Sequence, residues 1–146
     1  MPGTLTFPDA SCDAVIMHLM KPEWIRRAMA APFVMVASDG MPYAPGAHPR
    51  GAGTVARVLG LYVREENVLS LMDALAKMTI MPARRLEEYV PAMRNKGRIV
   101  VGGDADITVF DAATVLDQAT FKEPTKPSAG ITHVLVNGTF VVRNGE

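Results

Sequence analysis

The stretch from Phe33 to Gly40 limits the possible folds of this chain more than any other stretch, because an apolar run stops there at an acid and a glycine. A short apolar run bounded by turn residues predicts a strand buried on both faces, as in a parallel sheet. Asp39 follows its C-terminal end, which is the edge where α/β barrels carry their catalytic groups. Asp39 is therefore the leading catalytic candidate. The alternative is a simple turn, in which Asp39 bonds its own backbone and Gly40 takes a positive φ.

The residues before this run predict a helix between two strands. The apolar run Ala14–Met20 predicts the first strand, and Pro22 suits the first position of a helix. Pro32 ends that helix, after which the strand Phe33–Ala37 begins. A strand, a helix and a second parallel strand make a βαβ unit. His18 has no histidine at ligand spacing, so a core or boundary position is expected for it.

The remainder of the chain divides into a helical part and a strand-like part. In the helical part we expect a loop over 40–53, a helix over 55–63, a helix opened by the capping box Ser70–Asp73, a short helix over 82–86 and an irregular stretch over 87–97. In the strand-like part we expect strands at 99–101 and 107–111, a long connection over 112–130, and a hairpin of 132–136 with 139–142. Asn137-Gly138 suits the type I′ turn of that hairpin, because both turn positions need a positive φ.

A series of short motifs carries a resemblance to a known family. The motifs are Ser38-Asp39-Gly40, His48-Pro49-Arg50, Tyr62-Val63-Arg64-Glu65, Lys77-Met78-Thr79, Gly103-Asp104-Ala105-Asp106 and Val136-Asn137-Gly138. From about residue 14 onward the chain resembles the C-terminal part of the N-acyl-D-amino-acid deacylases (D-aminoacylases), in the amidohydrolase superfamily. The last two motifs occur across many amidohydrolases, whereas the first three point to the deacylase branch.

The resemblance implies an α/β fold that is only part of an enzyme. A TIM-type barrel needs on the order of 250 residues, and this chain has 146. We therefore expect a fragment, with the end of a metal-dependent amidohydrolase barrel in residues 1–96 and a small β-sandwich segment in 97–146. Such a fragment would expose apolar surfaces that the missing strands cover in the whole enzyme. We therefore expect a homodimer, or association with the absent part of the barrel.

The resemblance also implies the chemistry. Amidohydrolases activate water on one or two divalent metals, here expected to be zinc, and the aspartate after the last barrel strand takes the proton and often touches the metal. Asp39 matches that residue as base and metal ligand, while the other ligands would lie upstream. His48 and Arg50 follow in a loop expected over the active site. Arg50 could grip the carboxylate of an N-acyl amino acid with two parallel bonds, although local pairing of Arg50 is equally compatible with the sequence.

The composition of the chain argues against nucleic acid and membranes as partners. Two functions other than deacylation stay open. Lys plus Arg and Asp plus Glu number 15 each, so no net charge favours nucleic acid or an anionic membrane. No apolar run approaches the roughly 20 residues that span a bilayer. Cys12 is the single cysteine, and no secretory signal is visible, which favours the cytoplasm. The alternatives are a cyclic amide hydrolase resembling hydantoinases or dihydroorotases, and a non-catalytic assembly module.

Overall fold

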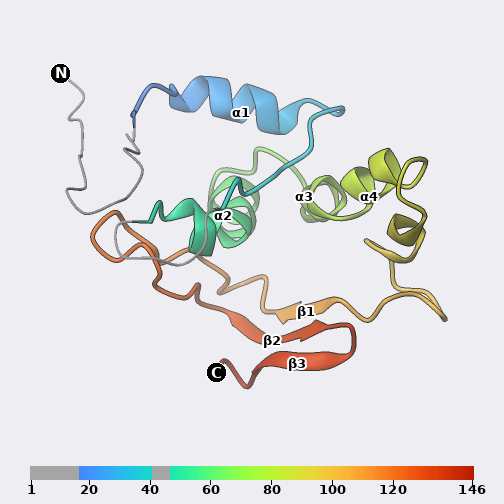
Figure 1. Ribbon diagram of the computed structural model, residues 1–146. Helices are drawn as coiled ribbons and strands as arrows, with labels where there is room; N and C mark the ends of the chain where they lie inside the picture. The colour runs from blue at the N-terminus through green and yellow to red at the C-terminus, as the bar shows by residue number, and fades with distance from the viewer. Residues whose placement is uncertain (1–16, 41–46) are drawn as a thin grey trace, which may run out of the picture.

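The computed structural model describes residues 17–40 and 47–146, and Figure 1 shows its arrangement. The helices are α1 (Pro22–Ala30), α2 (Arg50–Arg57), the π-helix η1 (Val58–Glu65), α3 (Leu71–Met78), α4 (Ile80–Leu86) and the 3₁₀ helix η2 (Pro91–Asn95). The strands β1 (Ile107–Phe110), β2 (Ile131–Val136) and β3 (Thr139–Arg143) form one antiparallel sheet in that order. In Figure 1 the helices α2 and α3 lie between α1 and the sheet. None of the helices in the described ranges combines the length and hydropathy that crossing a bilayer requires.

Local signals in the sequence set the starts of α1 and α3. Pro22 opens α1, as predicted. The predicted capping box opens α3: the Asp73 N–H donates to Ser70 Oγ at 3.1 Å, and the Ser70 hydroxyl donates to Asp73 Oδ2 at 2.7 Å. The predicted helix of residues 55–63 is also present, but it starts earlier, at Arg50, so the expected loop over 40–53 is wrong at its end. The short helix expected from Pro82 likewise starts earlier, at Ile80.

The π-helical turn of η1 marks a close approach between the helical part and the connection before β2. A Cβ added at Gly60 would lie 2.7 Å from the Val115 carbonyl oxygen, so the backbones pass each other where only glycine fits. The Arg64 guanidinium donates to the same oxygen at 2.6 Å. This contact lies between residues far apart in sequence, and it holds the connection against the helices.

The expected strands in the first part of the chain are not formed. Residues 33–37 and 99–101 have no strand partner among the described residues, and neither do 17–19; residues 14–16 lie outside the described range. The Val36 N–H donates to the Lys77 carbonyl oxygen of α3 at 3.1 Å instead of to a strand. Val101 is fully exposed. The βαβ prediction is thus wrong for the described residues, because a strand exists only when a neighbour accepts its ladder of hydrogen bonds.

The terminal hairpin follows the prediction closely. Asn137 and Gly138 have φ values of 48° and 78°, the positive pair that a type I′ turn requires. Asp106 Oδ1 accepts the Asn137 N–H at 2.7 Å, and the Lys96 ammonium lies 2.9 Å from Asp104 Oδ2 and 2.5 Å from Asp106 Oδ2. The Asp-Ala-Asp motif therefore ties the hairpin turn to the end of η2, which is a structural role.

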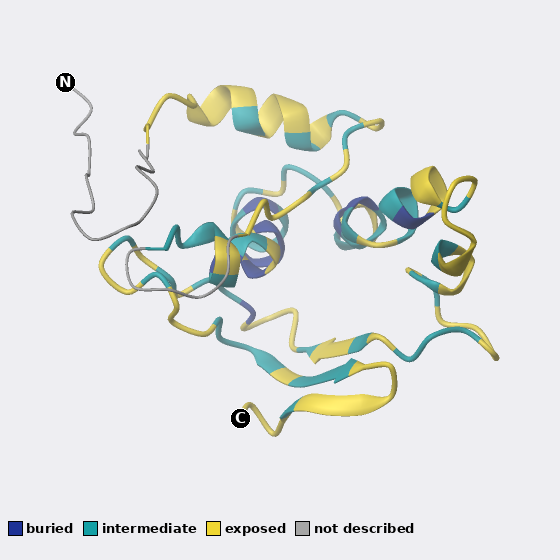
Figure 2. Cartoon of the chain, in the orientation of Figure 1, coloured by how far each residue is buried: buried dark blue, intermediate teal, exposed yellow. Residues whose placement is uncertain are grey.

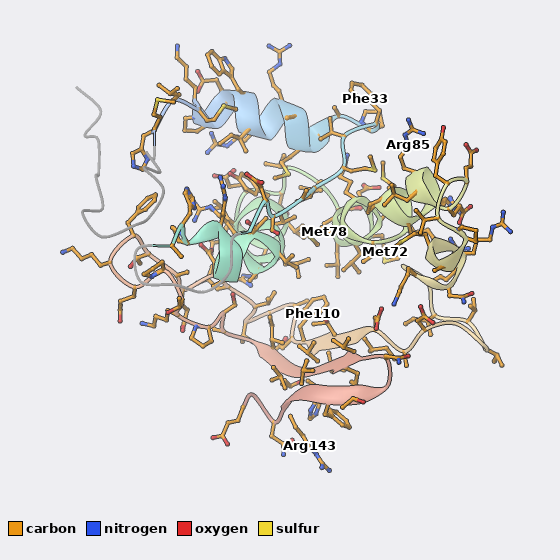
Figure 3. The ribbon with its side chains drawn as sticks, viewed as in Figure 1. Phe33, Met72, Met78, Arg85, Phe110 and Arg143 are labelled. Carbon is orange, nitrogen blue, oxygen red and sulfur yellow. The ribbon has the colours of Figure 1, made fainter. Side chains whose placement is uncertain are left out.

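The buried core is small and lies between the helices and the sheet. It comprises Ala56, Val58, Leu59, Tyr62, Ala74 and Val115. Figure 2 shows buried positions concentrated in η1 and α3, while most of α1 and β3 is exposed. Figure 3 shows Phe110 on the side of the sheet toward the helices, Arg143 on the opposite side, and Phe33 at the turn after α1. The ring of Phe33 is 80% exposed, so large apolar surfaces remain uncovered.

Candidate active site

Asp39 occupies a strained turn, and most of its side chain is exposed. Its φ is 47°, in the left-handed region that a non-glycine residue adopts at a cost of roughly 1–2 kcal/mol. The Ser38 hydroxyl oxygen accepts the Gly40 N–H at 3.2 Å, which closes the turn. The Asp39 side chain is 82% exposed. A turn is thus present, but it differs from the predicted one: Asp39 rather than Gly40 takes the positive φ, and the side chain of Ser38 rather than of Asp39 accepts the backbone N–H.

The segment that leads into this turn is held by a buried lysine. Lys77 of α3 is 4% exposed. Its ammonium donates to the carbonyl oxygens of Ala31 and Val34, the latter at 2.9 Å. Burial of a charge is costly unless hydrogen bonds replace its water, and these two carbonyl oxygens replace part of it. The backbone carbonyl of Lys77 also accepts the Val36 N–H. Lys77 therefore fixes the main chain just before Asp39.

Arg50 meets Asp39 from the first turn of α2. Its Nη2 lies 2.9 Å from Asp39 Oδ2, and its Nε–H donates to the Asp39 carbonyl oxygen at 2.8 Å. The Arg50 backbone N–H donates to His48 Nδ1 at 3.0 Å. The structure therefore brings together all three residues that the sequence singled out. The local pairing that the sequence left open for Arg50 is also present.

His48 lies against an aromatic ring from the C-terminal part of the chain. Its ring centroid is 5.2 Å from that of Phe121, edge to face, and His18 meets the same ring at 4.9 Å. Burial lowers the pKa of His48, and the nearby charges of Arg50 and His18 lower it further against the opposing effect of Asp39. The lowered pKa favours the neutral imidazole, and since Nδ1 accepts a hydrogen bond, the proton of that form is assigned to Nε2.

His18, His48, Arg50 and Phe121 line a cleft of about 600 Å³. Its lining combines apolar, aromatic and cationic side chains, among them Met17, His18, Met20, His48, Arg50 and Phe121. The Arg57 guanidinium lies 3.0 Å from Asp117 Oδ2, and the Ser128 hydroxyl donates to the Ala52 carbonyl at 3.0 Å. Both contacts tie α2 to the connection between β1 and β2. That connection therefore forms one wall of the cleft.

Sequence reasoning missed part of this lining. His18 is exposed rather than placed in a core, and its contact with Phe121 was not foreseen. Phe121 lies in a connection without periodicity, so no pattern in the sequence could have marked it. His133 Nδ1 accepts the Asn144 N–H at 3.2 Å at the end of the terminal hairpin, which is a structural contact.

The described residues do not make a metal centre by themselves. No group of three or more histidine, cysteine, aspartate or glutamate side chains in residues 17–40 and 47–146 could hold an ion. Zinc takes three or four protein ligands, and Asp39 supplies one carboxylate. A zinc site that included Asp39 would therefore need further ligands from outside the described residues.

Comparison with known proteins identifies the class. The model of the amidohydrolase family matches residues 13–142, and the chain belongs to that family. It is 46% identical over 141 residues to N-acyl-D-glutamate deacylase and 39% identical over 131 residues to D-aminoacylase, both of Alcaligenes xylosoxydans xylosoxydans. Those matches cover 89% and 90% of this chain, but 28% and 26% of the relatives. The chain thus spans a little over a quarter of their length.

Solved structures give the same result. N-acyl-D-glutamate deacylase from Bordetella bronchiseptica, complexed with zinc and a phosphonate mimic of the tetrahedral intermediate, matches with a TM-score of 0.74 and 43% identity, over 84% of this chain and 25% of that one. A D-aminoacylase with a binuclear metal centre matches with a TM-score of 0.83 and 37% identity, over 95% of this chain and 28% of that one. The predicted resemblance to the deacylase branch is confirmed.

Proposed function

We propose that this chain is the C-terminal part of an N-acyl-D-amino-acid deacylase, which hydrolyses the amide to a carboxylate and a free D-amino acid. The observation that carries the proposal is the contact of Arg50 with both Asp39 and His48, where Arg50 and His48 line one cleft, in a chain of the amidohydrolase family. An exposed carboxylate, a neutral imidazole and a guanidinium are the groups that amide hydrolysis of an anionic substrate needs.

Asp39 is the proposed general base. Its carboxylate takes the proton of the attacking water and then delivers it to the leaving nitrogen, so that the amine departs neutral. The constraint on both sides, by Lys77 before the turn and Arg50 after it, supports this role because a base must be held at the reacting atoms. A zinc ion, when bound, would polarise the scissile carbonyl and the water; Asp39 is the proposed contribution of this chain to its ligands.

Arg50 is the proposed binding group for the substrate α-carboxylate. Its fork of N–H donors suits a carboxylate with two parallel bonds. In the structure this fork is engaged by Asp39, and the pair is exposed, with 39% of the Arg50 side chain accessible. Exposed pairs contribute about 0–1 kcal/mol. A substrate carboxylate can therefore replace Asp39 on Arg50 at little cost, and this exchange frees the Asp39 carboxylate for the proton.

His48 is the proposed second substrate contact. Its Nδ1 is engaged by the Arg50 N–H, which leaves the Nε2–H as a donor. The lowered pKa favours the neutral ring, which donates one hydrogen bond without adding charge. This arrangement suits a substrate whose single carboxylate is already taken by Arg50.

The uncovered surfaces support the fold expected for the whole enzyme. We propose that residues 14–19 and 33–37 complete a TIM-type barrel with upstream strands, that residues 1–96 end the barrel, and that 97–146 belong to a β-sandwich. Exposed apolar residues in both parts, such as Met35, Ile99 and Val101, need such partners. Without them, a second copy of the chain would cover the same surfaces. Cytoplasmic location remains a prediction.

A fusion tests the function. The upstream part of the Bordetella deacylase, placed before this chain, would supply the remaining barrel and ligands. The zinc-loaded fusion should hydrolyse N-acetyl-D-amino acids, whereas this chain alone should not. Asp39→Asn should lower kcat by about 10²–10⁴. Glu123→Gln should not, because Glu123 is an exposed carboxylate whose ion pair within the described residues is a 3.9 Å contact with Lys126. A folded, zinc-bound fusion that cleaves only cyclic amides, or nothing, would refute the proposal in favour of a cyclic amide hydrolase or an assembly module.

A further inference from the structure

The connection between β1 and β2 brings an aromatic side chain to the candidate active site. Phe121 lies in a turn that two hydrogen bonds close: the Thr120 N–H donates to the Glu123 carbonyl oxygen at 3.1 Å, and the Glu123 N–H donates to Thr120 Oγ1 at 3.0 Å. Upstream, Asp117 is tied to Arg57 of α2. The ring is therefore held at both ends of its segment rather than attached to a free loop.

The ring of Phe121 meets the two histidines of the cleft at its edge. The interplanar angles are 80° with His18 and 76° with His48. Edge-to-face geometry at such distances contributes about 0.5–1.5 kcal/mol for aromatic pairs. His48 is in turn bonded to the backbone of Arg50. Phe121 thus borders the place where the substrate carboxylate is proposed to bind.

We propose that Phe121 is a specificity-determining residue, whose ring forms the wall against which the amino-acid side chain of the substrate packs. This inference rests on the proposed function. The side chain of an N-acyl amino acid is attached to the same carbon as the α-carboxylate, whereas the acyl group is one atom further away, beyond the nitrogen. A ring next to the carboxylate site therefore lies nearer to the amino-acid side chain than to the acyl group.

The chemistry of the neighbouring groups indicates which side chains fit. Met17 and Met20 line the same cleft and are adaptable apolar surfaces. Arg57, the other cation of the cleft, is already paired with Asp117, and so is not free to receive a second carboxylate without breaking that pair. Apolar and aromatic D-amino acids are therefore the expected preference.

The test compares side chains in the fusion described above. Phe121→Ala should lower kcat/KM about ten-fold or more for N-acetyl-D-leucine and N-acetyl-D-phenylalanine, and much less for N-acetyl-D-alanine, which has little to pack. Phe121→Leu, which keeps apolar volume, should retain most of the leucine activity. Phe140→Ala is the matched control, because Phe140 makes the same edge contact with a histidine, at 5.7 Å from His133, but lies on β3 away from the cleft.

A second measurement separates this inference from the proposed function. NMR titration of His48 in the chain itself should show its pKa rise toward the ordinary value in Phe121→Ala and stay unchanged in Phe140→Ala, since burial is what lowers it. An equal loss of kcat/KM on all three substrates, or an unmoved His48, would overturn the role of Phe121 while the enzyme remains a deacylase. A fusion inactive on every substrate, with the His48 titration as expected, would instead refute the proposed function.

Discussion

Replacing Val115 with alanine tests how the C-terminal connection is held to the helices. Val115 is 1% exposed and is one of the two largest fully buried side chains among the described residues. Its backbone is also enclosed, since a Cβ at Gly130 would lie 2.5 Å from the Val115 nitrogen and one at Gly60 would lie 2.7 Å from its oxygen. Neighbours that close cannot collapse far into a space left by a smaller side chain.

The expected loss follows from the atoms removed. Two buried methyl groups are worth about 1.5 kcal/mol of transfer free energy, and the cavity that remains adds a penalty that brings the total to about 2–3 kcal/mol. That is a large part of the roughly 5–15 kcal/mol that holds an ordinary domain together. Because the chain beyond Val115 carries Phe121, the same substitution should also loosen the wall of the cleft.

Urea unfolding measures this loss in the free energy of unfolding. Val115→Ala and the unaltered chain are compared at equal protein concentration, and the slopes of the two unfolding curves should be comparable. Val141→Ala is the control, because Val141 is 58% exposed on β3, and the loss there should stay within about 0.5 kcal/mol. A loss at Val115 no larger than at Val141 would refute the argument, since it would mean that the connection does not pack on the helices as described.

Three further predictions concern the substrate, the pH dependence and the assembly. Arg50→Ala in the fusion should raise KM for N-acyl amino acids more than for their esters, which lack the carboxylate; equal changes would assign Arg50 a structural role. The hydrogen bond from Lys96 is the main cause that lowers the pKa of Asp106, and the bond from the Asn137 N–H lowers it further. The contribution of Asp106 to folding stability is therefore complete above its ordinary pKa, and it disappears as the pH falls through the lowered value. Acid unfolding should accordingly show Asp106→Asn less stable than the unaltered chain at pH 7 and equal to it at the acid end; a constant difference would contradict this. Sedimentation at micromolar concentration should find the chain associated, most simply as a two-fold dimer, whereas a folded monomer would show that the exposed apolar runs need no partner.

Local chemistry in the sequence was sufficient to predict the elements whose stabilising contacts join neighbouring residues. The capping box of Ser70 and Asp73 and the Asn137-Gly138 turn depend on residues next to each other in the chain, so their hydrogen bonds and φ angles could be predicted directly. For Asp39 the sequence predicted a turn but not its details, since the positive φ falls on Asp39 itself and not on Gly40. The resemblance carried by the motifs also selected His48 and Arg50, and the structure brings both to Asp39.

Tertiary structure alone decided the features that depend on distant partners. The apolar runs at 33–37 and 99–101 have strand-like composition, yet they form no strands here, because strand pairing requires a neighbour and the described residues do not supply one. Lys77 reads as a surface lysine in a helix, and only packing against Ala31 and Val34 buries it. Phe121 has no periodic context, so its position between His18 and His48 follows from contacts such as Gly60 on Val115 and Arg57 on Asp117. These contacts join residues more than fifty positions apart, and their geometry is a property of the packed chain rather than of any local pattern.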